Sequence, residues 1–268
     1  MPVSFLIRHW KKELQVFHKN LLLLQNSSNP EAIHDLRVSI KKLRSYSKLY
    51  SALFKNDQPI PFLAETKKLF SVLGKQRNIE ISLELLNQFK AKGLLPSIQK
   101  HFEFYLEETK QRSSSALREY KADGLRSLTI DIEKTVSDID DETIKPRLLK
   151  LIRSSINEVR RLVKDFDKNY HLVRKKLKDI FYWSDIFPTD LYFSKQELKT
   201  LKSILDDLGN LQDHEVLRTN VQHYRQIVVA KGCSEYGKAK KLEESVNREK
   251  QELLDRADKM ISAVLERK

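Results

Sequence analysis

Residues 34–44 read His-Asp-Leu-Arg-Val-Ser-Ile-Lys-Lys-Leu-Arg, and residues 171–182 read His-Leu-Val-Arg-Lys-Lys-Leu-Lys-Asp-Ile-Phe-Tyr. Each stretch has a histidine, an arginine three residues later and a lysine seven residues after the histidine. Two Leu-Gly pairs follow in the same order, at Gly74 and Gly209. The histidines are 171 − 34 = 137 residues apart and the glycines 209 − 74 = 135, about half of the 268 residues. This spacing predicts an internal duplication.

The rest of the chain predicts α-helices. It contains only six glycines and seven prolines, too few for the many turns of a β-rich fold. Apolar residues recur three and four positions apart, which is typical of helices. We therefore predict an all-α fold of two pseudo-symmetric, four-helix bundle-like halves with a basic cleft between them. The predicted helices span residues 3–25, 31–54, 62–91, 97–121, 125–138, 144–166, 168–187, 195–230 and 234–266.

The duplication also predicts the domain organisation. We expect a single domain over residues 1–268, with a first half-repeat at 1–122 and a second at 144–268. An acidic connector occupies about 123–143 and includes the run Ser-Asp-Ile-Asp-Asp-Glu at 137–142, which we expect to be exposed.

The charge balance limits the kind of partner. Fifty Lys and Arg residues against 37 Asp and Glu give a net charge of +13, which favours nucleic acid, polyphosphate or an anionic membrane face. The single cysteine, Cys233, excludes an internal disulfide framework. The N-terminus lacks the apolar core of a signal peptide, and the longest aliphatic run is Leu21 to Leu24. We expect a cytoplasmic protein that does not insert into a membrane.

The two repeated stretches form cationic helix faces. Each helical residue advances by about 100°, so Arg37, Lys41, Arg44 and Lys48 fall within about 80° of His34, away from the apolar sector. The second stretch repeats the row with His171, Arg174 and Lys178. The helix at 144–166 carries further candidates at three- and four-residue steps, which are Arg147, Lys150, Arg161 and Lys164.

At these residues the chain resembles the CHAD family, the conserved histidine α-helical domain. The family signature is a His-x-x-Arg-x-x-x-Arg/Lys helix in each half, followed by a Leu-Gly-x-x-Arg/Asn-Asp stretch. The resemblance implies that basic helices line a central cleft, and that this cleft binds inorganic polyphosphate without catalysing a reaction. Such binding could target the protein to polyphosphate granules. Matching positions imply that the ligands are His34, Arg37, Lys41, Lys42 and Arg44 in the first half and His171, Arg174, Lys175 and Lys178 in the second.

The chain departs from the family pattern at several positions. Asn78 stands where aspartate is usual, Gln212 precedes Asp213, and Phe181 replaces an arginine. Lys41 and Lys42 stand where arginine is commoner, and a lysine offers phosphate a point charge in place of a bidentate fork. With these departures taken together, the second half is predicted to bind polyphosphate more weakly than the first.

Other functions remain open. A single basic stripe is usually a solvated face, but a stripe repeated with a histidine at its head favours a binding site. A nucleic-acid binder would place aromatic residues along the cationic row, and we expect Tyr46, Tyr50, Tyr182 and Trp183 to point away from it. A helical protein that docks an acidic partner is a further alternative.

The sequence predicts neither catalysis nor a cofactor. No Gly-rich phosphate loop, nucleophile elbow or zinc pattern occurs. The acidic cluster around Asp213 is spread around a helix, so we expect no metal site. The histidines could be ligands or structural residues, and Arg77 and Asp213 could either orient the basic row or form a plain salt bridge. Gly74 and Gly209 each cost a helix about 1 kcal/mol relative to alanine, and we attribute both to close helix crossing.

Overall fold

The protein is almost entirely helical. The computed structural model describes residues 4–26, 29–55, 61–89, 96–137, 139–186 and 192–266. These ranges contain α-helices and one short π-helix, with no β-strand among the described residues, so the predicted all-α class is confirmed. No helix in these ranges has the length and apolar character needed to cross a membrane.

The observed helices follow the predicted ones closely. They are α1 (Phe5–Asn26), α2 (Pro30–Phe54), α3 (Pro61–Phe89), α4 (Pro96–Glu119), α5 (Asp123–Val136), α6 (Asp141–Val163), α7 (Phe166–Ser184), α8 (Lys195–His223), the π-helix η2 (Tyr224–Val228) and α9 (Ser234–Glu266). The helix predicted at 195–230 therefore ends in a π-helical turn. The predicted helix ends at residues 3, 91, 138 and 187 lie outside the described residues.

Side-chain caps fix where several helices begin. The Asn29 side chain accepts hydrogen bonds from the first free amides of α2, and Ser194 forms a capping box with Glu197 at the start of α8. Asp140 caps α6 by accepting from the Thr143 amide at 2.7 Å. Its neighbour Asp141 accepts from the Ser4 hydroxyl at 2.8 Å. Part of the acidic run thus satisfies helix-end donors and ties the start of α1 to α6.

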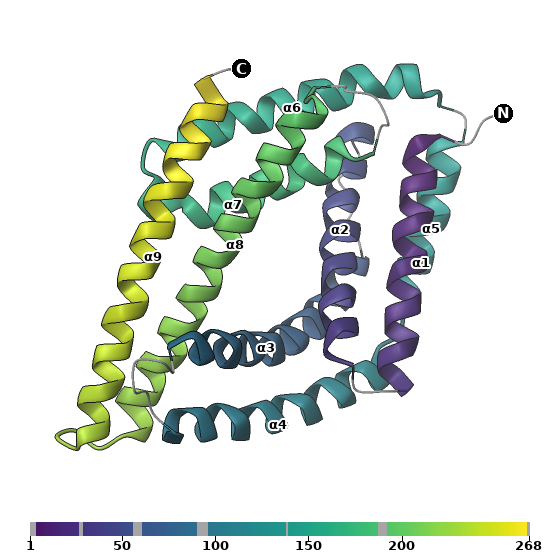
Figure 1. The fold of residues 1–268 in the computed structure, drawn as a ribbon. Helices are drawn as coiled ribbons and strands as arrows, with labels where there is room; N and C mark the ends of the chain where they lie inside the picture. Colours follow the sequence, from purple (N-terminus) through teal and green to yellow (C-terminus); the bar gives the residue numbers. More distant parts are fainter. Residues whose placement is uncertain are drawn as a thin grey trace.

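Four inner helices form a closed ring. Helix α2 packs against α3 and α7, and α8 packs against the same two helices. Each inner helix is paired with an outer one that adjoins it in sequence, namely α1 with α2, α4 with α3, α6 with α7 and α9 with α8. Figure 1 shows these pairs as the four sides of a frame. Contacts of α2 with α7 and of α3 with α8 are those that a pseudo-twofold would produce, while the duplication itself stays a prediction.

Two apolar cores support the ring. The larger one includes Leu36, Ile40 and Leu43 of α2, which are fully buried. A smaller core lies where the C-terminal ends of α3 and α8 meet the N-terminal ends of α4 and α9. Phe102 and Tyr224 belong to it. The cationic face of α2 is therefore directed away from the core and toward the ring interior.

The contact between α2 and α7 combines packing with polar anchors. Trp183 is 9% exposed, and its indole Nε1 donates to the Ser45 carbonyl oxygen at 3.2 Å. The Ser45 hydroxyl donates to Asp179 at 2.6 Å, and the Lys48 ammonium lies 3.0 Å from the same carboxylate.

Replacing Trp183 by alanine should lower the free energy of unfolding by about 3–5 kcal/mol, because a large buried side chain and its hydrogen bond are both lost. Urea unfolding of the purified protein measures this change. Leu172→Ala is the control on the same helix, because Leu172 is 47% exposed, and it should change stability by less than about 0.5 kcal/mol. A similar small effect of both variants would contradict the proposed role of this contact.

Candidate functional site

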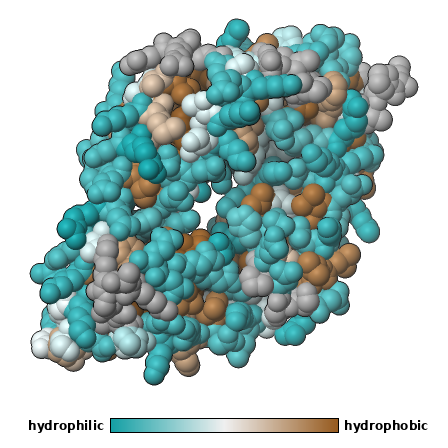
Figure 2. Space-filling view, viewed as in Figure 1, coloured by the Kyte–Doolittle hydropathy of each residue, from teal (hydrophilic) through white to brown (hydrophobic). Residues whose placement is uncertain are grey.

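The ring of inner helices encloses a cleft of about 800 Å³. Figure 2 shows a hollow near the middle of the molecule, bordered mainly by hydrophilic residues. Seven cationic side chains and two carboxylates line the cleft. The cations are Arg37, Lys41 and Lys42 from α2, Arg77 from α3, Arg174 and Lys178 from α7, and Lys202 from α8. The carboxylates are Asp206 and Asp213 from α8.

The amphipathic pattern of α7 directs its cations into this cleft. Val173, Leu177 and Ile180 of α7 are buried in the larger core. Arg174 and Lys178 lie on another face of the helix and line the cleft. The same arrangement holds for α2, so the two cationic rows face one enclosed space.

Arg37 is held rigidly at the wall between α2 and α3. Its Nη1 donates to the Phe70 carbonyl oxygen at 2.8 Å, and its guanidinium carbon lies 4.4 Å from the centre of the Phe70 ring. A Cβ atom on Gly74 would lie only 2.8 Å from the same Nη1. The atoms that approach Gly74 most closely therefore belong to the Arg37 side chain. The need to leave room for this side chain explains the glycine, in place of the close helix crossing that we expected.

Gly209 is related differently to its arginine. A Cβ atom there would lie 3.7 Å from Arg174 Nη2, an ordinary van der Waals distance. The two glycines of the repeated motif thus each face the arginine of the repeated helix, but only the first needs the missing side chain for space.

Burial and like charges together lower the pKa of the cations in the cleft. Burial, followed by the charges of Lys178 and Arg37, lowers the pKa of Lys41 to about 7. Burial and then the Arg174 charge lower the pKa of Lys178 to about 8. The pKa of Arg37 falls to about 10, through burial and the charge of Arg77. The cleft is therefore an unfavourable environment for its own cations, and a bound anion would relieve their repulsion.

Asp213 does not neutralise the cations fully. Burial raises the pKa of Asp213, although the charges of Arg174 and Arg77 oppose the rise. Arg77 is itself engaged within α3, with its Nη1 lying 3.0 Å from Glu84 and 3.3 Å from Glu80. Although burial alone would lower the pKa of Arg77, its hydrogen bonds to Glu84 and Glu80 raise it. Its ion pairs thus lie within one helix and do not join two helices.

The structure brings six of the fourteen predicted site residues to the cleft wall. They are His34, Arg37, Lys41, Lys42, Arg174 and Lys178. Lys42 also forms an ion pair with the buried Glu13 carboxylate at 2.8 Å. His34 is exposed over part of its surface. Desolvation of the rest of its ring, followed by the charges of Arg77 and Lys41, lowers its pKa.

The other eight predicted residues are not among those that line the cleft. The guanidinium carbon of Arg44 lies 5.6 Å from the centre of the Phe70 ring, and Lys48 pairs with Asp179. His171 Nδ1 is hydrogen bonded to Gln212 Oε1 at 3.0 Å. Two of the eight, Arg147 and Lys150, line a separate pocket beside the end of α2. The remaining three are exposed, namely Arg161, Lys164 and Lys175.

Sequence reasoning missed several lining residues. Arg77 was considered as an orienting residue, and its place three residues after Gly74 in the family-like motif was a usable signal. Lys202 lies seven residues before Gly209, which places it on the same face of α8 as the repeated glycine, and this spacing was a usable signal too. Tyr182 and Phe181 line the cleft, so the expectation that Tyr182 points away was wrong. Tyr46, Tyr50 and Trp183 are buried in the larger core. Within the described ranges, no group of three or more His, Cys, Asp or Glu residues could hold a metal ion.

Lys41→Met should stabilise the protein at pH 7 by up to about 4 kcal/mol, because the pKa of Lys41 in the folded state, about 7, lies far below the ordinary lysine value of 10.5. Below pH 7 both folded and unfolded states carry the charge, so the penalty is complete. As the pH rises from 7 to 10.5 the folded state loses the proton first, wild-type stability rises, and the difference from the variant shrinks.

Urea unfolding of both proteins at pH 7 and pH 10 measures this difference. Lys67→Met is the matched control, because Lys67 is exposed on α3 and should show no comparable pH-dependent gain. A variant that is less stable than the wild type at pH 7 would disprove the repulsion argument.

Gly209→Ala should stabilise the protein by about 0.5–1 kcal/mol, the usual gain inside a helix. Gly74→Ala should gain nothing or destabilise, because the new methyl group must displace Arg37 from its bond to the Phe70 carbonyl. The free energies of unfolding of the two variants test the asymmetry directly, and equal gains would refute it.

Comparisons with known proteins place these features in a family. A family model described as the CHAD domain matches residues 8–222. Among solved structures, the crystal structure of the CHAD domain from the plant Ricinus communis matches with a TM-score of 0.78. That match has 18% sequence identity and covers 97% of this chain and 91% of the other, so it establishes the shared fold alone. No curated protein matches the sequence.

Proposed function

The chain belongs to the CHAD family, and we propose that its central cleft binds inorganic polyphosphate without catalysing a reaction on it. The family is linked in general to polyphosphate binding. The observation that carries the proposal for this chain is the convergence of Arg37, Lys41, Arg174 and Lys178 on one enclosed space.

The charges of the cleft match those of a polyphosphate chain. Such a chain carries about one negative charge per phosphate and presents oxygens on all sides. Arginine and lysine bind these oxygens through charge-assisted hydrogen bonds, and arginine can do so with two N–H groups. An anionic ligand would also raise the depressed pKa of Lys41 and Lys178, so we expect binding to be accompanied by proton uptake near pH 8.

The composition of the cleft wall supports binding over catalysis. The described residues that line it include no serine, threonine or cysteine that could supply a hydroxyl or thiol nucleophile. Its acidic side chains, Asp206 and Asp213, lie among cations and offset part of their charge. We propose that these groups hold the ligand and that the protein serves as a binding module.

Nucleic acid is the alternative ligand. Phe181 and Tyr182 line the cleft, and single-stranded nucleic acid stacks its bases on such rings. Seven cations lie along the same wall, and polyphosphate needs only these, whereas a nucleic acid strand would also need room for its bases. Polyphosphate therefore remains the first choice, and the two ligands differ in how far they depend on Tyr182.

The double variant Arg37→Ala/Arg174→Ala should bind long-chain polyphosphate at least about tenfold more weakly than the wild type, because a charge-assisted hydrogen bond contributes about 1.5–3 kcal/mol. The matched control is Lys238→Ala/Lys241→Ala, which removes the same charge from exposed positions on α9. Titrations at several salt concentrations should also give a shallower salt dependence for the cleft variant, because fewer phosphates are neutralised.

Parallel titrations with single-stranded RNA and duplex DNA at one salt concentration separate the ligands. Tighter binding of RNA, lost in Tyr182→Ala, would replace polyphosphate by nucleic acid as the ligand. Equal losses from the cleft pair and the control pair would mean that no site exists. We further propose that the cleft targets the protein to polyphosphate granules in the cytoplasm, so a fluorescent fusion of the cleft variant should leave the granules while the control variant stays.

A further inference from the structure

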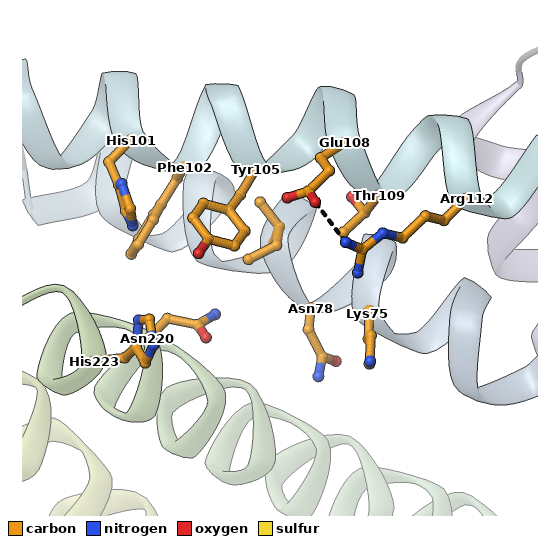
Figure 3. Close-up of a pocket in the computed structure, with 11 residues that line it drawn as sticks. Lys75, Asn78, His101, Phe102, Tyr105, Glu108, Thr109, Arg112, Asn220 and His223 are labelled. Atoms are coloured by element: carbon orange, nitrogen blue, oxygen red, sulfur yellow. Dashed lines mark hydrogen bonds and ion pairs between the residues drawn. The ribbon is translucent and has the colours of Figure 1, made fainter. Parts of the chain in front are cut away.

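A second pocket lies between α3, α4 and α8. Its volume is about 310 Å³. Asn78 lines both this pocket and the central cleft, so the two are neighbours across α3. Figure 3 shows His101, Phe102 and Tyr105 projecting from α4 toward Asn220 and His223 of α8, with Asn78 and Lys75 beside them.

One wall of the pocket is aromatic and well supported. The His101 ring lies 4.8 Å from the Tyr105 ring and 5.1 Å from the Tyr224 ring, between centroids. Phe102 and Tyr224 are buried in the smaller core, which anchors the wall. Burial and then the His223 charge lower the pKa of His101, so its ring is largely neutral at pH 7. Tyr105 is half-buried and offers a flat surface to a ligand.

The opposite side of the pocket supplies amide groups. The Asn220 Nδ2 donates to the Ser82 hydroxyl at 2.8 Å, which fixes the amide and leaves its Oδ1 as an acceptor. Asn78 of α3 contributes a second side-chain amide to the pocket wall. Amide side chains hydrogen bond to the edges of nucleobases, where donors and acceptors alternate.

The charge of this pocket differs from that of the cleft. Lys75 is exposed and makes no ion pair with another described residue. Arg112 lies 2.5 Å from Glu108, as Figure 3 shows. The two cations and one carboxylate of this pocket give a net charge of +1, whereas the cleft is lined by seven cations and two carboxylates. A single phosphate suits this pocket better than a polyphosphate chain.

We propose that this pocket binds a nucleoside monophosphate, with the base stacked on Tyr105, its edge hydrogen bonded to Asn78 and Asn220, and the phosphate held by Lys75 and Arg112. The volume falls at the lower end of the range for small-molecule sites, which favours a ligand with one ring system and one phosphate. The site shares Asn78 with the wall of the proposed polyphosphate cleft, but its other proposed ligand contacts are its own.

Equilibrium dialysis with AMP tests the proposal, with adenosine and ribose 5-phosphate as the two halves of the probe. The wild type should bind AMP more tightly than either half. Tyr105→Ala should weaken AMP binding at least about fivefold, the lower limit for loss of one base–aromatic stack. Lys75→Ala should weaken binding of AMP and leave that of adenosine unchanged.

Matched controls are available on the same helices. Gln111 is exposed on α4 and does not line the pocket, so Gln111→Ala should leave AMP binding unchanged. Lys67→Ala serves in the same way for Lys75. The cleft variant Arg37→Ala/Arg174→Ala should keep AMP binding, which separates this site from the proposed polyphosphate site.

Three results would overturn the proposal. They are the absence of AMP binding at millimolar concentration, equal losses from pocket and control variants, and loss of AMP binding in the cleft variant while Tyr105→Ala retains it. Lys75 is exposed, so Lys75→Ala keeps the test decisive even where removal of Tyr105 disturbs folding.

Discussion

The main constraint on this fold is that it must keep several like-charged side chains close together in one cleft. Arg37 and Lys41 of α2 face Arg174 and Lys178 of α7 across one cleft. Burial, and after it the mutual repulsion of these cations, lowers the pKa of the two lysines. The opposite faces of the same helices bury apolar residues in the larger core, and the bond from Trp183 to Ser45 joins the helices directly. Packing therefore offsets a repulsion that a bound anion would remove, which couples the stability of the fold to its binding chemistry.

Helical periodicity predicted much of this fold because its signals are local. The apolar spacing and the rarity of glycine and proline each act within a few residues, as do the caps that the structure shows at Asn29 and Ser194. The same reasoning identified cationic helix faces correctly but not what each face meets. The Arg147 side of α6 carries the same spacing as α2, yet it lies beside the end of α2 in another pocket. Which faces oppose one another is set by tertiary packing, and a single sequence holds no direct record of it.

The same limit explains part of what was missed. The spacing of Lys202 from Gly209 places both on one face of α8, but it does not reveal that α8 packs against α3 and α7 and so brings Lys202 to the cleft. Gly74 was recognised as unusual from its cost inside a helix, but its reason lies in the Arg37 side chain from another helix. Tyr182 comes four residues after Lys178, and a rotation of about 100° per residue places both side chains on one face of α7. The helical spacing therefore already held the signal that Tyr182 lines the cleft, and the expectation that it points away misread that spacing.

Adjacent lysines on α2 show how far identical residue types can differ in function. Lys42 is paired at 2.8 Å with Glu13, whose side chain is only 3% exposed and whose second oxygen, Oε2, lacks a hydrogen-bond partner among the described residues. Removing that lysine would leave a buried carboxylate without its counter-ion, so Lys42 is needed first for the packing of α1 on α2. Lys41 is surrounded mainly by other cations, so its charge remains available to an anion. Of two neighbouring lysines that the sequence presents as equivalent, one stabilises the packing of α1 on α2, and the other has the role of attracting the anion in the proposed function.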